Sequence, residues 1–453
     1  MRNVYLDHAA TTPMDPRVKA AMEPFLGESF GNPSAIYAAG RRAKEAIAEA
    51  REIIARALGS RAEEVIFTGS GTESDNMAVL GIARAYARFC PEFIVGRKAE
   101  LGGTRGHVIT SAIEHHAVLN PVQHLQKEGF TTTVLPVDEY GRVTPVAVAG
   151  ALTPETLLVS IMYANNEIGT IEPIAAIGKA IREWKKAQGR GVNDPPFFHT
   201  DACQAAGYLD VSVQNLGVDL LTVNGSKIYG PKGTGALYVR RGIKIEPLVF
   251  GGGQEQRLRS GTENVAGIVG FAEALRLVHE EREAECARLT PLRDKLIAGI
   301  IRDVPKVVLN GHPTERLPNN ANLSLLDIEG EAVLLYLDEY GISAATGSAC
   351  DSASLEPSHV ILALGRPYEY AHASTRFTLG RKTSREDIDY VLETLPGIVQ
   401  KLRSISPVHI EFGEKEACPP DRQARGMAKA FVDMGRPHWE KSIKHKTCPD
   451  TLT

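Results

Sequence analysis

EVIFTGSGTESDNMAVLGIARAYAR, residues 64–88, begins with a short β-rich run, turns at Gly69 and Gly71 and continues as a helical pattern. Further β-rich runs follow in HVITS, LLVSIMY, FFHTDA, DLLTVNG and ALYVRR, with helical patterns at 116–127 and 173–186 between them. Short strands that alternate with helices are typical of a layered sheet whose strands are mainly parallel. The sequence therefore predicts an α/β fold in which helices cover the sheet.

The length of 453 residues leaves room for two or three domains, since one domain takes about 100–200 residues. Two long helical patterns, 37–59 and 264–302, frame the alternating part, and mixed elements follow the second one. We expect a large domain over residues 17–280, a smaller domain formed by 1–16 and 281–405, and a polar, unpatterned tail of unassigned role over 406–453.

Composition and charge narrow the range of partners. With 43% apolar and 23% charged residues the chain is typical of soluble globular proteins, and a net charge of −4 gives no basic surface for nucleic acid or anionic lipid. The N-terminus reaches acidic residues before an apolar signal region can form, and no apolar run has the length of a membrane span. We therefore expect a cytoplasmic protein that binds neither nucleic acid nor membranes.

The six cysteines are scattered without a CxxC pair, which favours neither a disulfide framework nor a zinc site. Cys350 lies in GSACDSASLEP, residues 347–357, among residues too small to bury a thiol. Such a thiol is either a loop residue without a role or a nucleophile whose thiolate a neighbour stabilises. The tail residues fit no standard metal spacing, and we expect no metal site there: Cys418, Cys448, His438 and His445.

Three segments together indicate one cofactor. Lys227 follows a strand in the turn VNGSKIYGPKG, Asp201 ends the strand in FFHTDACQ, and FTGSGTESDN offers backbone N–H groups to an anion. Ser74 takes the third glycine position of a dinucleotide fingerprint, which disfavours that alternative. Pyridoxal 5′-phosphate needs a lysine for its Schiff base, an acid for its pyridinium nitrogen and a phosphate site. Lys227 alone would be an ordinary surface lysine, but the three segments together predict this cofactor.

His115 and His116 are neighbours in SAIEHHAVLN. Adjacent side chains point in different directions on any regular element, so the two histidines make a poor metal pair. One of them would stack on a pyridine ring, or else cap or pack a helix; the residues alone leave both alternatives open.

A series of ordered segments carries a family resemblance: YLDHAATTPMDPRV, FGNPSAIY, TGSGTESDN, EHHAVLN, NNEIGTIEPI, DACQ, SKIYGPKGTGALYV, RSGTEN, TGSACDSASLEPS and TRFTLGR. Over most of residues 2–405 the chain resembles the cysteine desulfurases of the NifS/IscS type, which are fold-type I pyridoxal phosphate enzymes of the class V aminotransferase family. The resemblance implies a mainly parallel seven-stranded sheet in the large domain, a smaller α+β domain and a homodimer.

The resemblance also assigns roles by position. Lys227 would carry the Schiff base, His115 would stack on the ring and Asp201 would hold the pyridinium nitrogen. The remaining positions fall into three groups: Asn166 and Gln204 for the phenolic oxygen; Gly71, Thr72, Asn224, Ser226 and the partner subunit's Thr262 for the phosphate; and Arg376 with Asn32 for the substrate carboxylate. Alternatively, Thr262 merely caps the helix that starts at TENVAG.

Two positions depart from the family pattern. Ser226 stands where relatives usually have a histidine before the lysine, and Asn224 stands where they often have a serine. Both side chains can donate to a phosphate oxygen, but a neutral donor binds more weakly than a charged imidazolium. We assign no role to Gln254, which stands where histidine is common.

The implied reaction converts L-cysteine to L-alanine. Lys227 would remove the Cα proton, and the Cys350 thiolate would attack the substrate sulfur, leaving a persulfide for an acceptor or iron–sulfur scaffold protein. Asp351 opposes thiolate formation, so His115 or the substrate would activate the thiol. Two alternatives stay open: a selenocysteine lyase, which shares every cofactor feature, and a non-catalytic assembly partner whose cofactor site has decayed.

Overall fold

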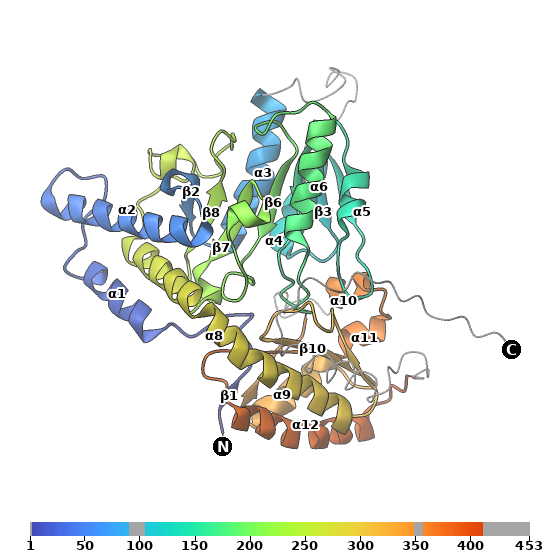
Figure 1. Cartoon of the computed structure of the whole chain (residues 1–453). Coiled ribbons are helices and arrows are strands. Elements are labelled where there is room, and N and C mark those ends of the chain that lie inside the picture. The colour runs from blue at the N-terminus through green and yellow to red at the C-terminus, as the bar shows by residue number, and fades with distance from the viewer. Residues whose placement is uncertain (1, 90–104, 348–356, 411–453) are drawn as a thin grey trace.

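The computed structural model describes residues 2–89, 105–347 and 357–410. Its largest sheet has seven strands in the order β2, β8, β7, β6, β5, β3, β4 (Figure 1). The strands are β2 (Val65–Thr68), β3 (His107–Ser111), β4 (Thr131–Leu135), β5 (Thr156–Ser160), β6 (Phe197–Asp201), β7 (Leu220–Asn224) and β8 (Gly235–Val239). Neighbouring strands are parallel except at β8, which is antiparallel to β2 and β7. The predicted α/β fold with a mainly parallel seven-stranded sheet is confirmed.

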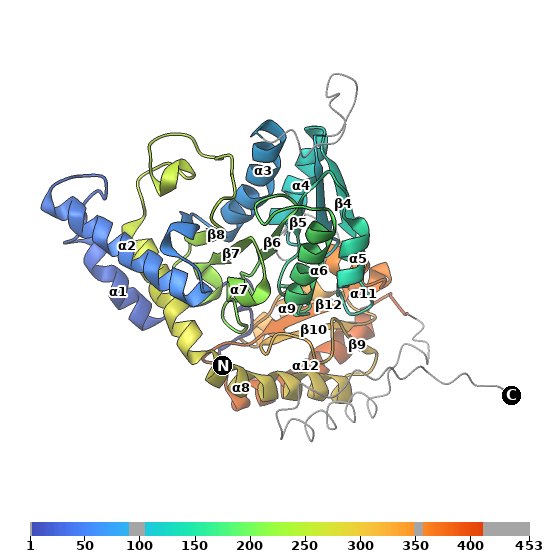
Figure 2. The same ribbon diagram turned by 45° about the horizontal axis from the view of Figure 1, so that its top comes forward.

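Helices cover both faces of this sheet. Successive side chains of a strand point to opposite faces, so Ile66 and Phe67, adjacent in β2, belong to different apolar cores. The core of Phe67 includes the apolar stripe of α6 (Ile174–Ala187), whereas the core of Ile66 includes α3 (Gly71–Phe89) and α4 (His116–Lys127). Figure 2 shows α6 in front of the sheet and α3 and α4 behind it. Shorter helices complete these layers: η1 (Ala62–Glu64), α5 (Pro145–Ala151) and α7 (Val213–Leu216).

A second, smaller sheet forms from the C-terminal part of the chain. Its three strands are antiparallel in the order β12 (Ser374–Thr378), β10 (Asn320–Leu325) and β9 (Val307–Leu309). Beside it, β1 (Val4–Tyr5) pairs in parallel with β11 (Ile342–Ser343), which brings the first residues of the chain to this sheet. Four helices accompany these strands: α9 (Gly330–Glu339), α10 (His359–Ala363), α11 (Tyr368–His372) and α12 (Arg385–Ile405).

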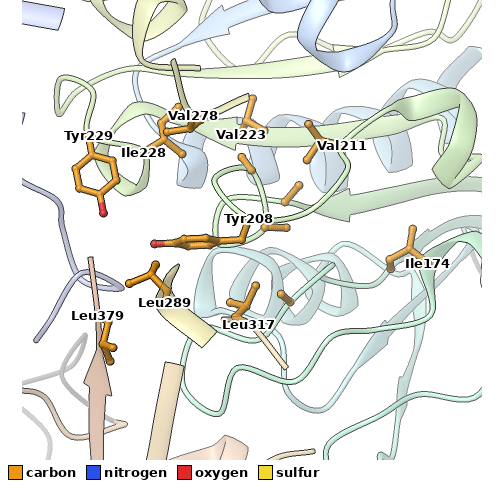
Figure 3. Packing of buried hydrophobic residues seen from close by; sticks show 14 of the residues in the cluster. Ile174, Tyr208, Val211, Val223, Ile228, Tyr229, Val278, Leu289, Leu317 and Leu379 are labelled. Atoms are coloured by element: carbon orange, nitrogen blue, oxygen red, sulfur yellow. The ribbon is translucent and has the colours of Figure 1, made fainter. Parts of the chain in front are cut away.

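The helix α8 (Val265–Asp303) runs past both sheets and joins the two parts of the molecule (Figure 1). Its first half packs against α1 (Pro16–Leu26) and α2 (Ala38–Leu58), and its second half packs against α12 and β10. Apolar side chains continue across this junction, and Figure 3 shows Leu289 of α8 below the ring of Tyr208. None of the helices in the described part of the chain, α8 included, is both long and apolar enough to cross a membrane.

One segment of the backbone is strained. Glu255, Gln256 and Arg257, which form η5 (Glu255–Arg257), have φ angles of 44°, 58° and 68° although none is glycine. The left-handed region brings Cβ close to the following carbonyl oxygen and costs roughly 1–2 kcal/mol per residue. Such strain persists only where the surrounding contacts hold the backbone in place.

Glu172 is a buried carboxyl group whose protonation links stability to pH. Its Oε2 accepts a hydrogen bond of 2.9 Å from the Val143 N–H, and its side chain is almost completely enclosed. Burial raises the pKa of Glu172 to about 8. The folded chain therefore keeps a proton that the unfolded chain releases near pH 4.5, so this group lowers the stability as pH rises from about 4.5 to 8.

We expect Glu172→Gln to reduce this pH dependence. Glutamine resembles the protonated acid, so the slope of the unfolding free energy against pH should become less negative by about 1.4 kcal/mol per pH unit between pH 5 and 8. Urea unfolding at several pH values measures the slope. Glu183→Gln makes the same change of residue at an exposed position of α6 and should leave the slope unchanged. Parallel slopes in the wild type and Glu172→Gln would contradict this account.

Candidate active site

The predicted ring-binding residues lie at one edge of the large sheet. β2, β3, β6 and β7 run in the same direction, so their carboxyl ends meet at this edge. Gly71 begins α3 after β2, and His115 caps α4 after β3. Asp201 is the last residue of β6, and Lys227 ends η4 (Gly225–Lys227) directly after β7. The sheet topology thus collects residues that lie far apart in the sequence.

The N-terminal segment holds the turn that carries Lys227. The Lys227 Nζ donates to the Ala10 carbonyl oxygen at 2.6 Å. Thr12 Oγ1 donates to the Ser226 carbonyl at 3.0 Å and accepts the Tyr229 N–H at 2.7 Å. Tyr229 has a φ of 62°, unusual for a residue with a side chain, and the bond to Thr12 helps to hold it there. The lysine is therefore set by contacts from the other end of the chain.

Asp201 is buried, and the charge of its carboxylate acts on the nearby ring of His115. Asp201 is 8% exposed, and its Oδ1 accepts the Cys203 N–H at 2.8 Å. Burial lowers the pKa of His115; the Asp201 charge opposes this shift, whereas the charge of Lys227 adds to it. The Nδ1 of His115 accepts the Ala117 N–H at 3.1 Å. A neutral His115 ring therefore carries its proton on Nε2 and presents an uncharged face to a ligand.

The start of α3 forms a cradle for an anion. A Cβ atom at Gly71 would lie 2.8 Å from the Cys203 Sγ and 3.1 Å from the Asn224 Nδ2, so the backbone of α3 approaches these groups as only glycine allows. The first N–H groups of a helix point at this position and favour negative charge. The Nδ2 group of Asn224, which lies beside Gly71, is a hydrogen-bond donor that suits the oxygen atoms of an anion. The residues present therefore fit a phosphate group.

Arg376 lies apart from this cradle, on β12 of the small sheet. Its side chain is 3% exposed; Nη1 donates to the Asn166 carbonyl at 3.0 Å, and Nη2 donates to Asp7 Oδ1 at 2.8 Å. Its Nε is buried without a partner in the described part of the chain. A guanidinium has five N–H donors, so Arg376 keeps capacity for a ligand carboxylate. Gln204 is held near the N-terminal segment that carries Asp7, because its Nε2 donates to the Ala9 carbonyl at 3.0 Å.

Two predicted site residues make no hydrogen bond to these groups within the described chain, and a third lies outside it. Asn32 is exposed in the connection between α1 and α2, and its Oδ1 accepts the Ser34 N–H at 2.9 Å. Thr262 is also exposed. It does not cap α8, because that role falls to Asn264, whose Oδ1 accepts the Gly267 N–H at 3.0 Å. Cys350 lies outside the described residues.

The sequence analysis missed a buried polar cluster beneath Asp201. His199 Nδ1 bonds with Ser160 Oγ at 2.8 Å and its Nε2 with Thr222 Oγ1 at 3.0 Å, while burial lowers the pKa of His199 to about 3. Burial raises the pKa of Glu114 to about 8, and burial together with the Asp201 charge raises the pKa of Asp75 far above its usual range. The sequence offered no clear signal for this cluster, because the neighbours of Asp75 in GTESDN are polar.

The protonation of this cluster has a chemical consequence. His199 is neutral, and the carboxyl groups of Asp75 and Glu114 are uncharged near neutral pH. An anionic Asp201 then faces no second negative charge from these two acids. This arrangement suits the pairing of one carboxylate with one cationic ring nitrogen.

Comparisons with known proteins identify the family to which this chain is similar. The family model of the class-V aminotransferases matches residues 4–391. Cysteine desulfurase IscS of Dictyoglomus turgidum is 50% identical over 412 residues, which cover 91% of this chain and 98% of the relative. Cysteine desulfurase IscS of Methanosarcina thermophila is 49% identical over 405 residues, with 89% and 94% covered.

Solved structures give the same result for the fold. A NifS-like protein superposes with a TM-score of 0.78 at 34% sequence identity, covering 88% of this chain and 100% of that protein. SspA, solved in complex with cysteine, superposes with a TM-score of 0.69 at 35% identity, covering 83% of this chain and 99% of SspA.

We expect Gly71→Ala to weaken the binding of pyridoxal 5′-phosphate at least about tenfold, or ~1.4 kcal/mol, because the new methyl group displaces Cys203 or Asn224 from the cradle. Titration of apo-protein with the cofactor, followed by absorbance, measures the affinity. Gly150→Ala in α5 meets no atom within 4 Å and serves as the control, with unchanged affinity expected. An unchanged affinity in Gly71→Ala would remove Gly71 from the cofactor site.

Proposed function

Because the chain belongs to the class-V aminotransferase family and, within it, to the cysteine desulfurases, we propose that it uses pyridoxal 5′-phosphate to convert L-cysteine to L-alanine and passes the sulfur on as a persulfide. The observation that carries the proposal is that Lys227, Asp201 and His115 lie at one edge of the sheet. The charges of Lys227 and Asp201 both act on the pKa of His115. The complex of SspA with cysteine supports the choice of substrate.

The cofactor, when bound, supplies an electron sink for the carbanion formed at the substrate Cα. Lys227 would hold it covalently, and Asp201 would keep the ring nitrogen protonated. The neutral ring of His115 would cover one face, and Asn166 and Gln204 would donate to the phenolic oxygen. The phosphate would lie at the start of α3, held by the N–H groups of Gly71 and Thr72 and by the side chains of Asn224 and Ser226.

Three side chains of the protein would each carry out one part of the reaction: Arg376, Lys227 and Cys350. Arg376 would bind the substrate carboxylate through its unpartnered Nε–H and orient the Cα–H bond toward Lys227, whose amine takes the proton. The Cys350 thiolate would then attack the substrate sulfur. The Cβ–S bond breaks, an S–S bond forms on Cys350, and the carbon keeps the electron pair and takes up a proton, which yields alanine.

The remaining parts of the proposal concern partners and location. The persulfide sulfur would pass to an acceptor protein, and iron–sulfur cluster assembly is the role that we propose for it. We also propose a cytoplasmic homodimer in which the partner subunit's Thr262 completes the phosphate site. Thr262 is exposed and therefore accessible to a second subunit, which supports this arrangement.

Two substitutions test the chemistry. Lys227→Ala should lose the visible absorption band of the bound cofactor and all turnover, since no other described lysine ends η4 at this edge.

Cys350→Ser should keep the band and still respond to L-cysteine, yet release no sulfide after reduction. Assays of alanine and sulfide, with L-selenocysteine as a second substrate, measure both. Lys232→Ala, an exposed neighbour, is the control. Substantial alanine production by Cys350→Ser would favour a lyase that works by direct elimination.

A third substitution tests the shared site. Removal of a hydrogen bond to a charged group costs about 1.5–3 kcal/mol, so Thr262→Ala should lower the cofactor affinity at least about tenfold. Titration of apo-protein measures the affinity, and analytical ultracentrifugation measures the oligomeric state. A wild-type protein that binds the cofactor fully as a monomer would rule out a shared site.

A further inference from the structure

The segment 249–262, which carries Thr262, is closed into a loop by its own contacts. Val249 and Arg259 form an isolated bridge, and Ser260 Oγ donates to the Gly252 carbonyl at 2.8 Å. The Gly261 N–H donates to Gln254 Oε1 at 3.2 Å. These bonds make the loop one unit, so any group that fixes its middle also fixes the position of Thr262 at its end.

The middle of the loop is the strained turn at 255–257, and a buried ion pair holds it. Arg51 on α2 donates to both carboxylate oxygens of Glu255, at 2.8 and 2.5 Å, and the two side chains are only 17% and 3% exposed. Glu255 Oε2 also accepts the Phe67 N–H of β2 at 2.7 Å. A two-point pair with an additional backbone bond fixes direction as well as distance. Glu255 is thereby held against α2 and β2 although its backbone conformation is unfavourable.

A second ion pair connects the same loop to the phosphate cradle. Arg259 Nε lies 2.9 Å from Glu73 Oε1, and the other oxygen of Glu73 accepts the Gly69 N–H at 2.8 Å. Glu73 belongs to the first turn of α3, next to Gly71 and Thr72. The loop is therefore braced at one point on the sheet and at another on the helix end that forms the cradle.

The surface around the loop suits a second copy of this chain. An open hollow of about 670 Å³ lies between the loop and the connection from α1 to α2, with Pro33 and Ser34 on one side and Gln254 and Gln256 on the other. The two segments that flank the hollow expose large apolar side chains: Phe30, Ile36, Tyr37, Val249 and Phe250. Side chains of this size are enriched in the buried centres of protein interfaces.

We propose that the Arg51–Glu255 pair is a positioning device that holds the strained loop so that Thr262 reaches the cofactor site of a second copy. The inference rests on the proposed function, because it assumes that the site is shared between subunits. Glu255 touches neither the cofactor nor the substrate in this arrangement. Its loss releases the turn, and Thr262 then no longer meets the partner's phosphate cradle.

Glu255→Gln tests the pair. We expect at least a tenfold loss of affinity for pyridoxal 5′-phosphate in a titration of apo-protein, together with a weaker dimer in analytical ultracentrifugation. Asp219→Asn is a matched control, because Asp219 also pairs with an arginine, Arg240, at 2.7 Å and accepts a strand N–H, that of Phe198, at 2.9 Å. It lies at the amino end of β7, away from the loop, and should change cofactor affinity less than twofold. Equal affinities in the two folded variants would overturn the proposal.

A second pair of variants leaves the ion pair intact and changes only the backbone preference. Arg257, at a φ of 68°, is exposed. Valine disfavours this conformation and glycine accepts it, so Arg257→Val should weaken cofactor binding and dimerisation, whereas Arg257→Gly should retain both. Equal behaviour of these two variants would also overturn the proposal.

The outcomes separate this inference from its premise. If Thr262→Ala leaves the cofactor affinity unchanged, the shared site itself fails. If Thr262→Ala weakens binding but Glu255→Gln and Arg257→Val do not, the shared site stands and the positioning role of the pair fails.

Discussion

The N-terminal segment 4–12 connects the two sheets, and the candidate site depends on its contacts. At one end β1 pairs with β11, and Asp7 binds Arg376 of the small sheet. A few residues later the Ala10 carbonyl receives the Lys227 amine, and Thr12 bonds to the turn after β7. The two cations assigned to the substrate carboxylate and to the cofactor are thus held by one short stretch of chain. A change in its path alters the separation of the two cations, and with it the size of the ligand that fits between them.

Buried charge imposes a second constraint on the site. Several carboxyl groups lie beneath the sheet edge, and an ionised carboxylate in such an environment is strongly disfavoured. Burial keeps the protons on Asp75 and Glu114, and it keeps His199 neutral. His199 is paired by hydrogen bonds with two uncharged partners, Ser160 and Thr222. Burial therefore has two effects. It keeps uncompensated charge out of the interior of the fold, and it leaves a single anion at the ring position.

The sequence was sufficient for the fold class because strand periodicity and the order of elements depend on local chemistry. The topology rule that ligands bind at the carboxyl ends of strands also placed Lys227 and Asp201 at one edge. Asp7 was missed, because nothing near it in sequence indicates that Arg376, hundreds of residues away, will pair with it. The strained turn at Glu255 was missed for a similar reason: local preference disfavours a left-handed glutamate, and only the tertiary contact with Arg51 explains it.

The phosphate position that the family resemblance assigns to Asn224 and Ser226 receives no charged side chain from either residue. Asn224 and Ser226 are neutral donors, so they contribute less by charge than an imidazolium would. The helix start at Gly71 supplies positive potential without a charged side chain, but this potential falls off within the first turn and acts only on a closely placed anion. Because the charge contribution is small, placement of the backbone donors matters more. The close approach of Gly71 to Cys203 and the braced position of Glu73 beside it are the features that secure this placement.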